Sequence, residues 1–282
     1  MPVRPAPRKV NPMAVLPRTA DTVEQLPARR PVAAAVLASA VYTVTVGAWL
    51  LLPWDHGTGS AGEWVVTLGV DLTRVVVAVA FLTTWRVWRP AGFAAAPTWG
   101  RVVPALPLLL LPALPVMLGP ALIDAPAWKF ALAAFSIATV AFGEEGVFRG
   151  VVMRVLLARG VRPALLGSAA LFGLMHVMNL ADNNHPITVA AQVVMTFGIG
   201  IGFGAVALAT GTIWPLLVIH FLMDFLNSIQ AAAPGESTGV ATSDLLLTGA
   251  LNVVLGLLTA GYGMWLLRRR VGLLREFDRP AP

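Results

Sequence analysis

The sequence predicts an all-α protein, a polytopic membrane helical bundle of about eight transmembrane helices with both termini in the cytoplasm. Of its 282 residues, 57% are hydrophobic and only 12% are charged, whereas about 25% of the residues of a soluble domain are charged. The apolar residues form runs of roughly 20, long enough to cross a hydrocarbon core about 30 Å thick. Lys and Arg gather in alternate connections between these runs, as they do in polytopic membrane proteins.

The apolar runs predict the spans and divide the chain. The predicted spans are 32–53, 63–85, 102–122, 127–153, 163–181, 187–209, 212–233 and 244–267. The third run is rich in Pro and should be kinked, because a Pro inside a helix removes a backbone hydrogen bond. We therefore expect a disordered cytoplasmic tail at 1–30, a transmembrane helical domain at 31–270 and a second cytoplasmic tail at 271–282.

The basic residues predict the orientation of the bundle. They lie in the N-terminal tail, the second connection, the fourth connection and the C-terminal tail: Arg4, Arg8, Lys9, Arg18, Arg29 and Arg30; Arg86, Arg89 and Arg101; Arg154, Arg159 and Arg162; Arg268, Arg269, Arg270, Arg275 and Arg279. The other connections carry mainly Asp and Glu. Because positive charge is retained on the cytoplasmic side, this pattern predicts eight spans and a multi-pass protein of the cell membrane.

Composition also excludes several functions. The chain has no Cys, which excludes disulfides, Cys-ligated metals and thiol catalysis. Its net charge of +6 does not indicate nucleic-acid binding, because the Arg residues flank apolar runs rather than forming a basic surface. The run Gly198–Gly204, with a Gly at every second position, is interpreted as a helix-packing surface and not as a nucleotide-binding loop.

Ionisable residues inside apolar runs are costly and are therefore functional candidates. Asp71 and Arg74 are three residues apart on one predicted helix and are expected to form a structural ion pair. Glu144 and Glu145 form the chain's only adjacent acidic pair. Glu145 can pair with Arg149 one helical turn later, which leaves Glu144 without a local partner.

Two further motifs place imidazoles in the membrane. Phe172 and His176 are four residues apart on the fifth span, and His220 and Asp224 are four apart on the seventh, so each pair shares a helix face. Counting about 1.5 Å per residue from the cytoplasmic side, Glu144, His176, His220 and Asp224 fall at a similar depth. We therefore expect three helices to present one polar cluster.

This cluster predicts hydrolysis by one of two mechanisms. Glu144, His176 and His220 form a ligand set suited to Zn²⁺ with an open water position. Without a metal, Glu144 could act as the general base while His220 and Asp224 stabilise an oxyanion. Asp224 would need to be protonated to donate a hydrogen bond. The sequence leaves the metallo-type and the glutamate-type mechanisms open.

The three motifs together resemble the CPBP family, also called Abi, which includes the type II CAAX prenyl proteases and bacteriocin-processing and immunity proteins. They stand here as Glu144-Glu145-Gly-Val-Phe-Arg149, Phe172-Gly-Leu-Met-His176 and His220-Phe-Leu-Met-Asp224, within about residues 125–235. The resemblance implies an eight-helix intramembrane endopeptidase, with Glu144 activating water and His176 assisting. It also implies that His220 and Asp224 stabilise the oxyanion or help to bind a metal.

The resemblance further implies that Glu145, Arg149 and Phe172 support the site. The substrate of the protein would be a membrane-associated or lipidated protein or peptide. It would be of the prenylated CAAX type if the chain acts as the prenyl proteases do. Asp224 stands where those proteases often have Asn.

Two other classes of function remain open: a non-catalytic immunity or scaffold protein of the membrane, and a proton-coupled transporter that uses buried acids as a relay.

Overall fold

The structure, a computed structural model, describes residues 26–51, 61–118, 126–181, 185–229 and 242–269. These residues form helices and no strands, which confirms the predicted all-α membrane bundle. The predicted tail 271–282 and residues 1–25 of the predicted tail 1–30 lie outside the described residues. Within the described part of that first tail, Leu26–Arg29 form one helical turn, α1.

Each predicted span corresponds to one helix or to a series of consecutive helical segments. The first four are α2 (Pro31–Ala48, continued by a 3₁₀ turn to Leu51), α3 (Ala61–Thr84), the series α4 (Trp99–Val102), η4 (Val103–Leu109) and α5 (Leu110–Leu118), and the series α6 (Ala127–Glu144), η5 (Glu145–Val152), α7 (Met153–Leu156) and η6 (Leu157–Arg159). The last four are α8 (Val161–Met175, continued by η7 to Leu180), α9 (Pro186–Thr210), α10 (Trp214–Ser228) and α11 (Thr242–Arg269).

Six of these segments are long and apolar enough to cross a membrane. They are Pro31–Ala48, Val65–Thr84, Ala127–Arg159, Val161–Leu180, Pro186–Thr210 and Leu245–Arg269. The other two are shorter. The Pro-rich segment becomes a 3₁₀ helix between Val103 and Leu109, with Pro107 inside it, and α10 has only 15 residues. The count of eight spans stays a prediction.

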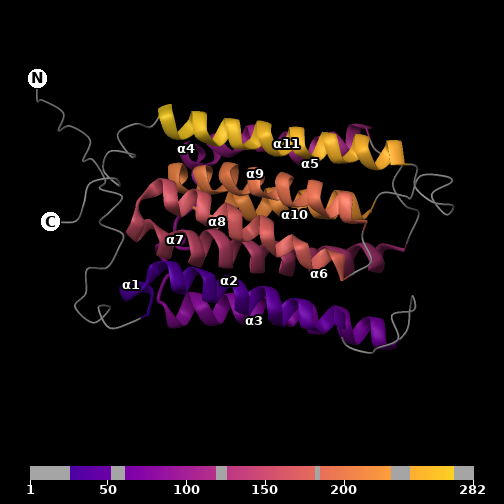
Figure 1. Ribbon diagram of the computed structural model, residues 1–282, viewed down its shortest axis with the longest axis horizontal. Helices are drawn as coiled ribbons and strands as arrows, with labels where there is room; N and C mark the ends of the chain where they lie inside the picture. The colour runs from indigo at the N-terminus through magenta and orange to yellow at the C-terminus, as the bar shows by residue number, and fades with distance from the viewer. Residues whose placement is uncertain (1–25, 52–60, 119–125, 182–184, 230–241, 270–282) are drawn as a thin grey trace, which may run out of the picture.

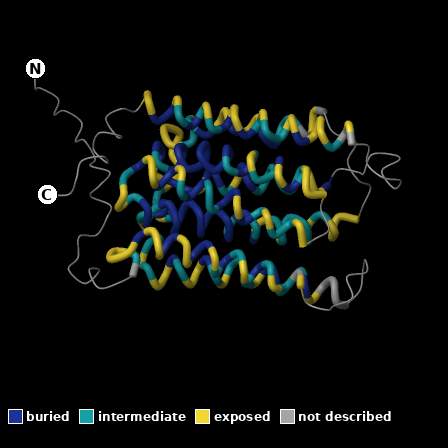
Figure 2. Tube along the Cα trace, in the orientation of Figure 1, coloured by how far each residue is buried: buried dark blue, intermediate teal, exposed yellow. Residues whose placement is uncertain are grey.

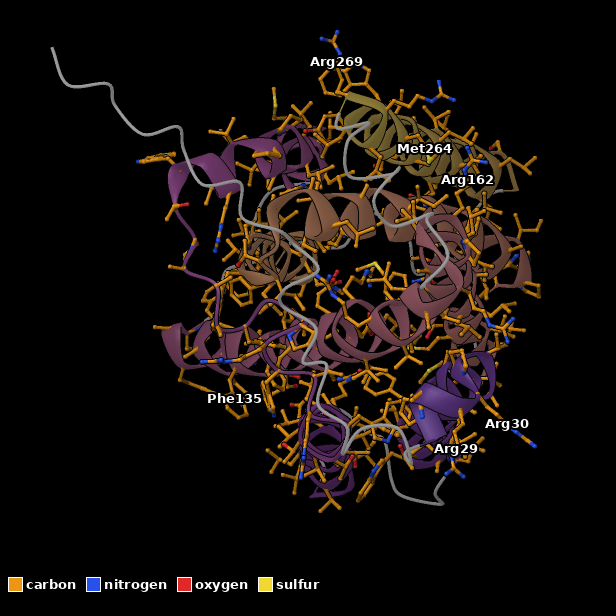
Figure 3. All side chains as sticks on the ribbon, turned by 90° about the vertical axis from the view of Figure 1, so that its left-hand side faces the viewer. Arg29, Arg30, Phe135, Arg162, Met264 and Arg269 are labelled. Atoms are coloured by element: carbon orange, nitrogen blue, oxygen red, sulfur yellow. The ribbon has the colours of Figure 1, made fainter. Side chains whose placement is uncertain are left out.

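The segments run back and forth along one direction, so that α1 and the C-terminal end of α11 lie at the same end of the bundle (Figure 1). Arg29, Arg30, Arg162 and Arg269 lie around the rim in the view from this end (Figure 3). These Arg residues therefore lie at the end of the bundle that the sequence predicts to be basic. That this side is cytoplasmic stays a prediction.

Helix α9 forms the centre of the bundle, packed between α8 and α11. Burial follows this arrangement, since the tube is darkest along the inner helices (Figure 2). The glycines of α9 allow this helix to approach α11 closely. A methyl group at Gly198 would overlap the backbone of Gly256, and one at Gly202 would overlap the backbone of Thr259. This confirms the predicted packing role of the Gly198–Gly204 run, because small residues let membrane helices come into backbone contact.

Two glycines of α11 offer a matched test of this packing. A Cβ at Gly256 would lie 2.8 Å from the Met195 Cα atom, whereas a Cβ at Gly261 would meet nothing within 4 Å. We expect Gly256→Ala to lower the free energy of unfolding by about 1–3 kcal/mol, because the two helix backbones must separate. Gly261→Ala should be neutral. Reversible unfolding in mixed detergent micelles would measure both, and equal effects would contradict this account of the α9–α11 contact.

Candidate active site

The candidate site begins where the fourth apolar segment changes its helical winding. Glu144 is the last residue of α6, and Glu145 is the first residue of the π-helix η5. All eight residues of η5 are buried. π-Helical turns are rare and often occur at functional sites. The wider turn places two successive carboxylates in the interior of the bundle.

Gly143 permits this segment to lie against the first two spans. A Cβ at Gly143 would approach the Tyr42 hydroxyl to 2.8 Å and the Arg74 Cβ atom to 2.9 Å. A larger residue would therefore push α2 and α3 away from Glu144. The small residue just before the acidic pair is what brings Tyr42 and Arg74 to the site.

Glu145 and Arg149 form the predicted ion pair, with 3.0 Å between Arg149 Nη1 and Glu145 Oε1. The side chains are 0% and 1% exposed. The guanidinium also lies 4.0 Å from the centre of the Phe172 ring and 5.5 Å from that of Phe203. Contact with the faces of aromatic rings adds to the stabilisation of a buried cation. Phe172 thus packs against the ion pair, and its supporting role stays a prediction.

His220 joins the two acidic residues to α10. Its Nδ1 lies 2.8 Å from Glu145 Oε1, and its Nε2 lies 3.7 Å from Glu144 Oε2 and 3.3 Å from Asp224 Oδ2. Ionised carboxylates only accept hydrogen bonds, so this arrangement suits a ring that donates from both nitrogens. An imidazolium held among three carboxylates is therefore a preorganised donor beside Glu144.

His176 has a different hydrogen-bonding arrangement. Its Nδ1 lies 2.9 Å from the carbonyl oxygen of Phe172, which can only accept a hydrogen bond. Nδ1 therefore carries the proton, and in a neutral ring Nε2 keeps its lone pair. The His176 ring also packs edge-on against Phe172, with 5.0 Å between ring centres. These two contacts fix the orientation of the imidazole.

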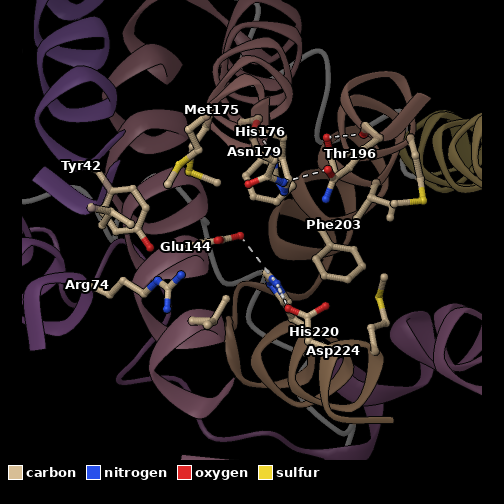
Figure 4. A pocket seen from close by; sticks show the side chains of 18 residues that line it. Tyr42, Arg74, Glu144, Met175, His176, Asn179, Thr196, Phe203, His220 and Asp224 are labelled. Carbon is tan, nitrogen blue, oxygen red and sulfur yellow. Dashed lines mark hydrogen bonds and ion pairs between the residues drawn. The ribbon is translucent and has the colours of Figure 1, made fainter. Parts of the chain in front are cut away.

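A cavity of about 320 Å³ connects these groups (Figure 4). Glu144, His176, His220 and Asp224 all line it, together with Phe172. The structure therefore brings together the four side chains that the sequence predicts to converge. Glu145 and Arg149 lie behind the cavity wall. The roles of these residues stay predictions.

Sequence reasoning missed five polar side chains of the cavity wall, which are Tyr42, Arg74, Asn179, Gln192 and Thr196. Tyr42 from α2 and Arg74 from α3 both line it. Arg74 forms the predicted ion pair with Asp71, with 3.3 Å between Nη1 and Oδ1. The ion pair with Asp71 accounts for the charge of Arg74 within one helix, so the sequence offers no reason to place Arg74 in the site. Tyr42 belongs to no recognisable sequence motif. Only the packing of α2 and α3 against Gly143 reveals their place.

The predicted zinc ligands can be compared with the donor geometry of the described residues. Among the described residues, no group of three or more His, Asp or Glu side chains is arranged to hold a metal ion. The predicted ligands Glu144, His176 and His220 share the cavity, but His220 uses Nδ1 for Glu145 and presents Nε2 to two carboxylates. The donor geometry thus gives the predicted zinc site and the metalloprotease interpretation no support.

A comparison with known protein families finds a similarity over this segment. Residues 126–226 match the family model described as Rce1-like, type II CAAX prenyl endopeptidase Rce1-like. Over these residues the chain is similar to that family, which supports the resemblance to CPBP-family intramembrane proteases that the three motifs carry. The match runs from the start of α6 into α10 and contains all three motifs of the site. No curated protein matches the chain.

The match supports the resemblance predicted from the sequence at its coarser level. The chain is a membrane-integral, multi-pass protein, and the match supports a CAAX-type intramembrane protease in general terms. As a membrane-integral protein, the chain contacts the lipid bilayer. The reaction mechanism and the particular substrate are matters of proposal.

Proposed function

We propose that the protein is an intramembrane endopeptidase in which Glu144 activates a water molecule to hydrolyse a peptide bond of a membrane-bound, prenylated CAAX-type protein. One observation carries the proposal. Glu144, only 8% exposed, faces a cavity inside the helical bundle and lies 3.7 Å from His220 Nε2 on a separate helix. A carboxylate base beside a fixed hydrogen-bond donor is the arrangement that water-mediated amide hydrolysis requires.

The reaction follows from the roles of these atoms. The Glu144 carboxylate takes one proton from water, while the lone pair on His176 Nε2 helps to orient that water. The resulting hydroxide adds to the peptide carbonyl, and the carbonyl electron pair moves onto oxygen. His220 stabilises this oxyanion by donating from Nε2. The C–N bond then breaks, and Glu144 returns its proton to the departing amine.

Asp224 has a specific place in this scheme. Its Oδ2 lies 3.3 Å from His220 Nε2, where a carboxylate pairs with the charged ring and leaves the Nε2 proton to be donated to the oxyanion when substrate is bound. A carboxylate in this position orients the ring and stabilises its positive charge, as carboxylates do for other functional imidazoles. Asp224 can therefore serve where relatives use Asn, by acting through His220.

The remaining cavity wall supports a hydrophobic substrate. Four Met side chains line the cavity: Met175, Met178, Met195 and Met223. Met is flexible and polarizable, and it adapts to irregular apolar ligands. Together with the family match, this supports a lipidated protein or peptide as substrate.

The proposal is tested by incubating the purified protein in proteoliposomes with a farnesylated CAAX peptide. We expect a shortened, farnesylated product identified by mass spectrometry. Lys129→Ala, on the exposed end of α6, should cleave at the wild-type rate. Absence of product with several prenylated CAAX peptides would favour the non-catalytic interpretation. Proton flux without cleavage, measured with an enclosed pH-sensitive dye, would favour the transporter.

Metal content tests the choice between the two mechanisms. Because no group of donor atoms among the described residues is arranged to hold a metal ion, we expect protein purified without chelators to carry far less than one zinc per chain. Cleavage should also survive dialysis against a chelator. About one zinc per chain in the wild type, lost in His176→Ala and His220→Ala, would contradict this expectation and establish the predicted ligand set.

A further inference from the structure

Two side chains of the cavity wall have no part in the hydrolysis described above. Tyr42 is 1% exposed, yet its hydroxyl makes no hydrogen bond within the part of the chain that the structure describes. Arg74 likewise leaves its buried Nε without a hydrogen-bond partner there. Buried polar groups are nearly always hydrogen-bonded, so each unsatisfied group needs an explanation. Both residues line the cavity into which a substrate would enter.

The ion pair with Asp71 fixes Arg74 without using all of its donors. Asp71 is 3% exposed, and its Oδ1 accepts hydrogen bonds from Ser136 at 3.0 Å and Thr139 at 2.8 Å. Arg74 reaches the same oxygen through Nη1 at 3.3 Å. A guanidinium has five N–H donors, so most of them stay available for another acceptor. The anchored Asp71 therefore holds a cation at the edge of the cavity.

Arg74 gives the cavity wall an uneven charge. It is the only Lys or Arg among the described residues that line the cavity. Tyr42 and Arg74 lie on one side of Glu144, and His220 and Asp224 lie on the other (Figure 4). An anionic group of a substrate would be repelled near Glu144 and Asp224, because charges in a desolvated site are weakly screened. It would be stabilised near Arg74.

We propose that Arg74 and Tyr42 bind the free α-carboxylate at the C-terminus of the substrate, and so direct cleavage to a bond close to the chain end. This inference rests on the proposed endopeptidase function. A carboxylate only accepts hydrogen bonds, and a guanidinium donates to both of its oxygens in one plane. The Tyr42 hydroxyl supplies a further donor. The cavity is small, so an extended peptide held at Arg74 reaches Glu144 within a few residues, at about 3.3–3.6 Å per residue.

The test compares one farnesylated CAAX peptide as the free acid and as the C-terminal amide. For the wild type we expect kcat/KM to be at least about tenfold higher for the acid, because hydrogen bonds to a charged group contribute more than neutral ones. In Arg74→Gln the preference should fall to about twofold or less, and Tyr42→Phe should lie between. Arg74→Lys keeps the charge and should retain part of the preference.

Two controls separate recognition from structural damage. Arg74→Gln leaves Asp71 without its cation, so Asp71→Asn with Arg74→Gln provides a charge-balanced variant that should show the same loss of preference. Equal cleavage of acid and amide by the wild type would overturn the inference. So would an Arg74→Gln variant that cleaves both peptides more slowly but keeps their ratio, since Arg74 would then only hold the fold.

Binding distinguishes failure of this inference from failure of the proposed function. The affinity of the acid and the amide for Glu144→Gln, measured by fluorescence anisotropy in detergent, does not depend on turnover. Tighter binding of the acid that is lost on adding Arg74→Gln would support the carboxylate subsite even if the wild type cleaves neither peptide. Equal affinities would overturn the subsite and leave the endopeptidase function to be judged by cleavage alone.

Discussion

Glu144→Gln is expected to lower kcat for peptide cleavage by about 10²–10⁴-fold, the range typical for loss of a positioned general base. Gln has nearly the same shape as Glu and keeps the packing at the end of α6, but it cannot accept a proton from water. The KM for the farnesylated peptide should change little, because Glu144 acts on the water and not on the lipid or the peptide. Steady-state cleavage in proteoliposomes measures both quantities.

The fold of this variant must be verified separately. Glu144 pairs with His220 only at 3.7 Å and stays slightly exposed, so its neutralisation should leave the unfolding midpoint close to that of the wild type. Lys129→Ala provides the matched control on α6. A Glu144→Gln variant that is folded and cleaves at more than about one tenth of the wild-type rate would exclude Glu144 as the base.

Arg149→Gln should produce the largest loss of stability. Its partner Glu145 is fully buried and would keep only His220 at 2.8 Å as a charged neighbour. Removing one member of a buried ion pair typically costs about 3–5 kcal/mol, because the other charge stays desolvated and uncompensated. The contacts of the guanidinium with Phe172 and Phe203 would be lost as well. Equilibrium unfolding in mixed micelles would measure the change.

The double variant Glu145→Gln with Arg149→Gln separates charge imbalance from lost packing. It should recover part of the stability lost in Arg149→Gln, because no buried charge is left without its partner. Arg159→Gln, an exposed Arg at the end of the same segment, should change stability by no more than about 0.5 kcal/mol. A similarly small effect of Arg149→Gln would contradict the structural role of this pair.

The sequence predicts the helices and the contacts within each helix well. Runs of apolar residues mark the eight helical segments, and the four-residue spacing of Glu145 and Arg149 predicts a pair that the structure contains. These features depend only on the period of one helix. The short α10 and the 3₁₀ break at Val103–Leu109 show where length and Pro content make the count of spans ambiguous.

Contacts between helices were harder to predict. The contact of Glu145 with His220 joins residues 75 positions apart, and its existence depends on the π-helical winding after Glu144. Helical periodicity gives the face of each residue but not the rotation of one helix against another. Because Arg74 pairs with Asp71 on its own helix, the sequence does not indicate that Arg74 lines a cavity. Packing at Gly143, which no single-helix pattern reveals, determines its position.

In the proposed reaction, water activated by Glu144 cleaves the substrate. The most direct measurement is a single-turnover reaction of wild type and Glu144→Gln with a farnesylated CAAX peptide in ¹⁸O-enriched water, with both fragments analysed by mass spectrometry. We predict one ¹⁸O atom in the new carboxyl group of the farnesylated fragment from the wild type, and no such fragment above background from Glu144→Gln. The same labelled fragment at the same rate from both proteins would contradict the claim.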